Sequence, residues 1–285
     1  MRKPSTSDIR DAVLSRRAIS FIAAFVAVAL AAGIGLGQFR DDRDYSAPVA
    51  TWEIDRDFAH DVFTFARVRY RSYGRERRGD GWQTDYPDSD LNFSYRLQQL
   101  TSLEVNPTPK VVNLTDEELF DHPFIYIVEP VQLYFEDDEV AALRRYLLNG
   151  GFLMVDDLWG DDQFEHIHRE LKKIFHDRDW VELPLDHEIF HCVYDLDRKP
   201  QVPSIHAAQR GRSQGITWQG GDDARIPHYR AFFDDHDRMV TLICHNTDIG
   251  DGWEREGEEE WYFREFSEKQ SYPMGINIVV YALTH

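Results

Sequence analysis

The sequence predicts an α/β fold in three layers, a mostly parallel β-sheet with helices on both faces, preceded by one hydrophobic N-terminal helix. Two continuous apolar runs of strand length, Phe124–Val128 and Phe152–Val155, predict strands buried on both faces. A helical pattern joins them, and the order strand, helix, strand is typical of parallel sheets. The N-terminal helix is predicted from Ala18–Gly37, a long stretch without a charged side chain.

Composition restricts the classes of function. The chain has 285 residues, of which 42% are hydrophobic and 29% charged, and this is the composition of a globular protein. A net charge of -19 argues against nucleic-acid binding, because phosphate contacts need a surplus of Lys and Arg. With only two cysteines the chain cannot form a disulfide framework, so an ordinary hydrophobic core must stabilise it.

The N-terminal segment predicts export or membrane attachment. Residues 1–17 are basic, residues 18–37 are apolar, and acids are frequent in the chain that follows. Under the positive-inside rule, this order places residues 1–17 in the cytoplasm and the body in the periplasm. One interpretation is a single-pass anchor in the bacterial inner membrane, formed by residues 18–37. The alternatives are a cleaved signal of the twin-arginine export route, with Arg16 and Arg17 as the pair and cleavage near Ala31, or an amphipathic or buried helix.

The rest of the chain is expected to form a polar linker over residues 38–57 and one domain over residues 58–285. Apolar and polar residues alternate along Phe63–Tyr70, which predicts a half-buried strand, at the edge of the sheet or early in it. A loop follows, and then a helix capped by Asp88 or Ser89. The apolar residues of this helix are Leu91, Phe93, Tyr95, Leu97 and Leu100.

The central elements follow in order. A capping-box spacing at Thr115–Glu118 predicts a short helix before the first buried strand. The helix between the two buried strands begins at Asp137 and ends before Gly150 and Gly151. After the second buried strand we expect a further helix over Gln163–Phe175.

The pattern is mixed beyond Trp180, where Met239–Cys244 gives the one clear strand. The acid-rich segment Asp248–Glu260 is expected to be a solvated loop, because its acids do not follow the EF-hand spacing of a calcium site. A C-terminal helix over Met274–Leu283 is expected to dock on the sheet.

Several segments together carry a family resemblance. They are EVAALRRYLLNGGFLMVDDLWG at Glu139–Gly160, FARVRY at Phe65–Tyr70, Asp85-Tyr86-Pro87, DHPFIYI at Asp121–Ile127, LDHEIFH at Leu185–His191 and GINIVVYAL at Gly275–Leu283. These segments resemble the bacterial family named domain of unknown function 4159 over nearly all of the body. That family looks like a relative of the class I glutamine-amidotransferase-like superfamily, whose fold is flavodoxin-like with three layers. The resemblance also implies an accessory role at the cell envelope, with MoxR-type AAA ATPases or von Willebrand factor A proteins as partners.

The resemblance raises the question of amidotransferase activity, because amidotransferases carry a cysteine nucleophile on the turn after the corresponding strand. Here that turn reads Asp156-Asp157-Leu158-Trp159 and contains neither Cys nor Ser. We therefore expect no amidotransferase activity. The favoured hypothesis is a non-catalytic domain that binds a partner or a polar ligand in the bacterial cell envelope.

The candidate ligand site lies where the second buried strand ends. Asp156 and Asp157 are expected at its carboxyl end, where ligands bind in open α/β sheets, and Trp159 offers an apolar wall. The superfamily layout implies that Asp186 and His187 lie beside them. Two carboxylates and an imidazole suit a cation or polar ligand, or acid–base chemistry, so the alternative function is a cell-envelope or carbohydrate hydrolase using Asp156, Asp157 and His187. A simpler interpretation is an acidic loop whose first Asp caps the next helix.

The sequence gives no convincing metal or cofactor signal. His187–His191 matches the H-E-x-x-H pattern of zinc proteases, but that pattern needs a helix, and Pro184 lies just upstream. We therefore expect a turn at this place, and no metal or cofactor. Cys192 and Cys244 are either paired in a disulfide or free, and the sequence leaves both alternatives open.

Overall fold

A computed structural model describes residues 49–54, 61–73 and 81–285. The expected anchor or signal over residues 18–37 lies outside these ranges, as do residues 1–17 and most of the expected linker. Among the described residues, no helix combines the length and the apolar character that crossing a membrane requires. Within the linker, Trp52 contacts the domain, since its Nε1 donates a hydrogen bond of 2.7 Å to the carbonyl of Val105.

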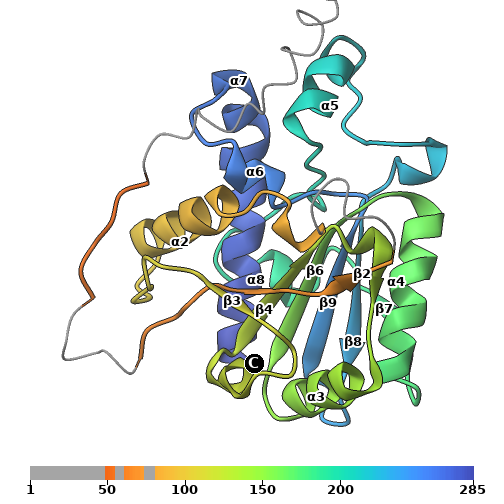
Figure 1. The fold of residues 1–285 in the computed structure, drawn as a ribbon. Coiled ribbons are helices and arrows are strands. Elements are labelled where there is room, and N and C mark those ends of the chain that lie inside the picture. Colours follow the sequence, from red (N-terminus) through yellow and green to blue (C-terminus); the bar gives the residue numbers. More distant parts are fainter. Residues whose placement is uncertain (1–48, 55–60, 74–80) are drawn as a thin grey trace, which may run out of the picture. The chain divides into compact units, whose positions relative to one another are not determined.

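A seven-stranded sheet lies at the centre of the domain, with the strand order β3-β1-β4-β6-β9-β8-β7 (Figure 1). The first five of these strands pair in parallel, and β8 and β7 pair antiparallel at one side. Their bounds are β1 (Ala66–Val68), β3 (Lys110–Val112), β4 (Phe124–Val128), β6 (Phe152–Leu158), β9 (Met239–His245), β8 (His228–Phe233) and β7 (Val181–Glu182), and a separate pair is formed by β2 (Arg71–Ser72) and β5 (Leu133–Tyr134).

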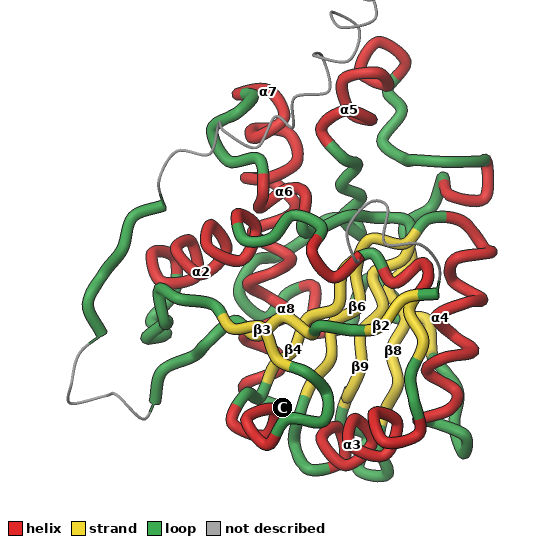
Figure 2. Tube along the Cα trace, in the orientation of Figure 1, coloured by secondary structure: helices red, strands yellow, loops and turns green. Residues whose placement is uncertain are grey.

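Helices cover both faces of the sheet (Figures 1 and 2). Alternate residues of β4 explain why: Phe124 and Tyr126 join the core with α2 (Asp88–Leu100) and α8 (Tyr272–Thr284), whereas Ile125 and Ile127 join the core with α3 (Asp137–Leu148) and α4 (Gly160–Ile174). The other helical elements are α5 (Ile205–Gly211), α6 (Asp251–Glu254), α7 (Glu260–Tyr262), a π-helical segment Phe263–Ser271, and 3₁₀ turns at Gly81–Gln83, Glu117–Asp121, Pro130–Gln132, Glu188–Phe190, Arg212–Gln214 and Asp222–Ala224.

The predicted mixed α/β fold with a mostly parallel sheet is confirmed, and so are the helices α2, α3, α4 and α8 and the strands β4, β6 and β9. The strand predicted within Phe63–Tyr70 is present as β1, the first strand among the described residues, but it is fully buried and lies between β3 and β4 instead of at the edge. The alternation of apolar and polar residues assigned Arg67 to solvent. Arg67 is instead fully buried, because its guanidinium group donates hydrogen bonds inside the domain.

Two further expectations need correction. Asp248–Glu260 is not simply a solvated loop, since Asp248 and Asp251 are only 4% and 5% exposed. They are buried because they accept hydrogen bonds within the domain, Asp248 from the backbone of Asp251 and Asp251 from the backbone of Ile205 and the hydroxyl of Tyr262. The strand β8, with its antiparallel pairing, was not predicted at all.

The turn between α3 and β6 uses two glycines for different reasons. Gly150 has φ of +109°, where a Cβ is strained although no atom would lie within 4 Å of it. At Gly151 a Cβ would lie 2.3 Å from the ring of Tyr146, which is held in place because its hydroxyl donates to the carbonyl of His122. A larger residue in place of Gly151 would therefore clash with the fixed ring of Tyr146.

We expect Gly151→Val to destabilise the domain by about 1–3 kcal/mol through overpacking against Tyr146. For Gly150→Ala we expect a loss of about 1 kcal/mol from backbone strain alone. Urea denaturation of the two variants beside the wild type measures both values. A Gly151→Val variant as stable as the wild type would contradict this account of the turn.

Candidate functional site

The two aspartates singled out by the sequence lie at the carboxyl end of β6. Asp156 faces the α2 and α8 side of the sheet, in step with Phe152 and Met154. An extra residue then interrupts the pairing with β9, and Asp157 occupies this bulge with φ of +56°. Neither aspartate caps α4, whose N-cap is Trp159, so the simpler interpretation as a helix cap is wrong.

Asp156 is completely buried. Its Oδ2 accepts hydrogen bonds from the hydroxyl of Tyr126 at 3.0 Å and from the backbone N–H of Gly250 at 2.9 Å. The backbone N–H groups of Ile249 and Asp157 also lower the pKa of this carboxyl group, but within the described part of the chain its Oδ1 accepts no hydrogen bond of good geometry. Burial raises the pKa of Asp156 to about 6, although these hydrogen bonds favour the ionised form. Hydrogen bonds to Oδ2 therefore hold Asp156 in place, and Oδ1 takes no part in them.

Trp159 contacts the pair differently from the expected apolar wall. Its indole Nε1 donates a hydrogen bond of 2.8 Å to Oδ1 of Asp157, and so fixes that carboxylate. Burial raises the pKa of Asp157 well above its ordinary value, and the nearby charges of Glu129 and Asp156 raise it further.

The structure does not bring Asp186 and His187 to this pair. The ring of His187 lies 5.7 Å from that of Tyr281, which stacks on the C-terminal His285. Burial lowers the pKa of His187, and the charges acting on it are those of Glu188, His285 and Asp186. In Figure 1 the C-terminal end of α8 lies at the opposite end of the domain from α6. The layout carried over from the superfamily fails here because the segment around His187 packs on the end of α8.

The H-E-x-x-H segment forms the expected turn. Glu188–Phe190 is a 3₁₀ turn, and His191 contacts Asp195 and the carbonyl of Leu185. The cysteine alternatives are also decided, since Cys192 and Cys244 are both free.

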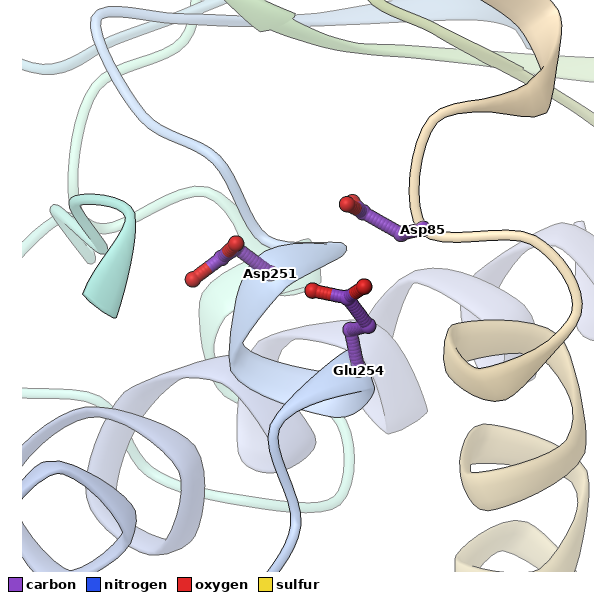
Figure 3. Close-up of side chains that lie close together, drawn as sticks. All are labelled: Asp85, Asp251 and Glu254. Atoms are coloured by element: carbon purple, nitrogen blue, oxygen red, sulfur yellow. The ribbon is translucent and has the colours of Figure 1, made fainter. Parts of the chain in front are cut away.

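Sequence reasoning missed a second group of acids that meets this edge of the sheet. Asp85 comes from the loop before α2, and Asp251 and Glu254 come from α6 (Figure 3). One carboxylate oxygen from each of the three lies within 4.8 Å of the others. A signal was present in the sequence, because Asp85 belongs to a segment of the family resemblance and Asp251 and Glu254 to the acid-rich stretch.

Arg67 holds the loop that carries Asp85. Its Nη1 donates to the carbonyl of Thr84 at 2.7 Å, and its Nη2 donates to the hydroxyl of Ser89 at 2.8 Å. Its Nε donates to Asp90 at 2.9 Å, and both members of this ion pair are fully buried. Arg67 of β1 thus holds the backbone before Asp85 and the side chains of Ser89 and Asp90 after it.

We name these residues the carboxyl-edge acidic cluster: Asp85, Asp156, Asp157, Asp248, Asp251 and Glu254. Burial is the largest cause that raises the pKa of every member, to about 7 for Glu254, and neighbouring carboxylates raise it further for Asp85, Asp157, Asp248 and Glu254. Two arginines act on the cluster, but Arg67 is engaged by Asp90, and Arg255 lies 2.5 Å from Glu254 and 3.1 Å from Glu258. The cluster therefore carries more potential negative charge than its surroundings neutralise.

This arrangement favours binding over covalent catalysis. A group of buried carboxylates takes up either protons or a cationic group. No Cys or Ser lies on the turn between β6 and α4. The imidazole whose charge acts on the cluster is that of His206, near Asp251, and not that of His187.

Fold and site together define an α/β domain with a buried acidic cluster at the carboxyl edge of its sheet. Residues 64–283 match the family described as Domain of unknown function (DUF4159), so the chain belongs to that family, as the sequence segments predicted. A search of curated proteins found no match to the chain.

Proposed function

We propose that this is a non-catalytic binding domain of the bacterial cell envelope, which takes a cationic or polar group of a ligand or partner at the carboxyl-edge acidic cluster. One observation carries the proposal: Asp156 is completely buried, its Oδ1 accepts no hydrogen bond of good geometry from the described residues, and it is accompanied by other acids. Leaving a buried carboxylate oxygen without a partner is unfavourable. A cationic group bound at the cluster offsets that cost. This edge of the sheet is therefore expected to contribute most of the binding free energy.

We also propose that the domain is related to the flavodoxin-like, class I glutamine-amidotransferase-like superfamily. Asp157 lies in the bulge at the end of β6, two residues before the Trp159 that joins β6 to α4, and has a positive φ. A strained residue at such a connection is typical of the nucleophile position in related α/β enzymes. An Asp there, hydrogen-bonded to Trp159, supports a domain that kept the geometry and lost the nucleophile. The hydrolase alternative with His187 is not proposed, since the contacts of His187 are with the end of α8.

The binding proposal predicts a stabilisation that depends on Asp157. We expect one class of organic cation, among polyamines, guanidinium compounds and a lysine-rich peptide, to raise the melting temperature of the full-length chain purified in detergent. Asp157→Asn removes a charge of the cluster, so the rise is expected to be at least halved in this variant. Differential scanning fluorimetry measures it.

Asp197→Asn is the matched control, because Asp197 is 80% exposed and its carboxylate pairs with its neighbour Arg198. The stabilisation should persist in this variant. An equal response of the wild type and Asp157→Asn, or no response of the wild type to any of the three classes, would contradict the proposed site.

The location of the body follows from the basic and apolar residues 1–37 and is part of the same proposal. We expect the protein to stay with the inner membrane after a carbonate wash, and crosslinking in native membranes to recover an envelope partner, a MoxR-type ATPase or a von Willebrand factor A protein. A soluble body that lacks residues 1–31 would contradict the anchor and favour the twin-arginine route.

A further inference from the structure

Three carboxylates from two separate elements converge within the acidic cluster. Asp85 approaches from the loop before α2, and Asp251 and Glu254 approach from α6, so that one oxygen of each lies within 4.8 Å of the others (Figure 3). The helices α2 and α6 pack against each other, which fixes the two sides of the group. Carboxylates at this separation repel one another unless a positive charge lies between them.

A second observation points to a ligand in this space. Oδ2 of Asp85 is fully enclosed and accepts no hydrogen bond, and the same holds for Oδ1 of the completely buried Asp156. Both residues approach Gly250, where a Cβ would lie 2.5 Å from the hydroxyl of Tyr126, 3.3 Å from Oδ2 of Asp85 and 3.7 Å from Oδ2 of Asp156, the oxygen that Tyr126 and Gly250 hold. Buried polar atoms in native proteins nearly always have partners, so the enclosed Oδ2 of Asp85, on a carboxylate that belongs to the group of three, calls for a cation.

We propose that Asp85, Asp251 and Glu254 bind one Ca²⁺ ion, with Asp156 beside them. This inference rests on the proposed function and names the cation that the acidic cluster takes. A Ca²⁺ ion has oxygen ligands at about 2.3–2.6 Å in flexible geometry, and one ion at this distance reaches oxygens that lie within 4.8 Å of one another. Mg²⁺ demands a near-ideal octahedron, and Zn²⁺ prefers the nitrogen and sulfur ligands that are missing from this set.

The neighbours of the three ligands are arranged for this role. Oδ2 of Asp251 accepts hydrogen bonds from the backbone N–H of Ile205 at 2.8 Å and from the hydroxyl of Tyr262 at 3.0 Å, which orient the carboxylate. Glu254 lies against Arg255, which also pairs with Glu258 at 3.1 Å. Arg255 thus keeps a carboxylate partner when Glu254 binds the ion.

Calcium binding to the full-length chain, treated with EDTA and then freed of it, tests the inference. Isothermal titration calorimetry with CaCl₂ is expected to show one site, and Tb³⁺, an oxygen-preferring substitute for Ca²⁺, should give luminescence sensitised by Trp253, which lies on α6 between two of the ligands. Asp85→Asn and Glu254→Gln should each weaken Ca²⁺ binding by more than about tenfold, since the loss of mere outer-shell groups already costs 10- to 100-fold.

Asp197→Asn is the matched control, because Asp197 is 80% exposed, pairs with its neighbour Arg198 and is not one of the three ligands. Its Ca²⁺ affinity should equal that of the wild type. Circular dichroism and melting in EDTA establish that each variant is folded, and Glu254→Gln keeps the test decisive where Asp85→Asn fails to fold.

The inference is overturned if millimolar Ca²⁺ does not bind, if folded Asp85→Asn and Glu254→Gln variants bind it as the wild type does, or if Mg²⁺ or Zn²⁺ binds more tightly than Ca²⁺. These outcomes are distinct from failure of the proposed function. A response to organic cations that requires Asp157, in a protein that binds no Ca²⁺, would keep the proposed function and remove the calcium ion. Calcium binding without any response to organic cations would keep the calcium site and remove organic cations as ligands of the cluster.

Discussion

Replacing Arg67 with methionine is expected to destabilise the domain by about 3–5 kcal/mol, the loss typical of breaking a buried ion pair from one side. Arg67 and Asp90 are both fully buried, so methionine leaves the Asp90 carboxylate without its main counter-charge. It also removes the donors to the carbonyls of Trp82 and Thr84. Urea denaturation of the EDTA-treated protein gives the free energy of unfolding.

Arg71→Met is the control for this substitution. Arg71 lies close in sequence and also has carboxylate neighbours, Glu136 at 3.5 Å and Glu139 at 3.7 Å, but its side chain is 55% exposed. Exposed ion pairs contribute about 0–1 kcal/mol, so this variant should be nearly as stable as the wild type. Equal stability losses in the two variants would show that Arg67 is not the internal support of the Asp85 loop.

Arg67 also explains where the sequence stops predicting the fold. The strands β4 and β6 are continuous apolar runs, so their burial on both faces follows from their composition. In β1 an arginine occupies the alternate position, and a period-two pattern assigns such a residue to solvent. The partner that makes its burial favourable, Asp90, lies in α2, and no local pattern connects the two.

The candidate site was predictable only in part for the same reason. Asp156 and Asp157 follow a recognisable buried strand, so their place at its carboxyl end could be inferred from the chain alone. Asp251 and Glu254 lie in a stretch so rich in acids that solvation was the reasonable expectation. What buries Asp251 and partly encloses Glu254 is packing of α6 against α2, together with hydrogen bonds from Ile205 and Tyr262 to Asp251, and the packing joins distant parts of the chain.

His187 shows the opposite error, where a resemblance predicted too much. Family layout suggested an imidazole beside Asp156, but the 3₁₀ turn at Glu188–Phe190 places His187 against Tyr281. The rings of Tyr281 and His285 stack with centroids 4.1 Å apart, so aromatic packing at the C-terminus accounts for this position. A resemblance in fold does not transfer the positions of residues outside the shared strands.

The acidic cluster predicts an unusual dependence of stability on pH in the cation-free protein. Burial raises the pKa of Asp156 from 3.8 to about 6 and that of Glu254 from 4.5 to about 7. Between the unfolded and folded pKa values the folded state binds more protons, so the free energy of unfolding falls as pH rises. We expect a loss of about 4 kcal/mol between pH 5 and pH 8 from these two groups, since one pKa unit corresponds to about 1.4 kcal/mol.

Below this window the slope should reverse, because other carboxylates have the opposite shift. Burial acts to raise the pKa of Glu182, but hydrogen bonds from His228 and Lys199 lower it to about 2. Such a group stabilises the fold above its unfolded pKa of 4.5, and this contribution disappears as the pH falls toward 2. Stability of the EDTA-treated protein is therefore expected to be greatest near about pH 5.

Asp156→Asn assigns this slope to the cluster. Asparagine keeps an oxygen that accepts from Tyr126 and Gly250 but carries no charge, so the variant should be more stable than the wild type at pH 8 by about 1 kcal/mol and nearly equal to it at pH 5. Urea denaturation at both pH values in EDTA measures the difference, with the exposed Asp197→Asn expected to follow the wild type at each. The opposite result would be an Asp156→Asn variant that is less stable than the wild type, by a larger margin at pH 8 than at pH 5. In that case the ionised Asp156 stabilises the fold, and the cluster does not need a cation to offset its charge.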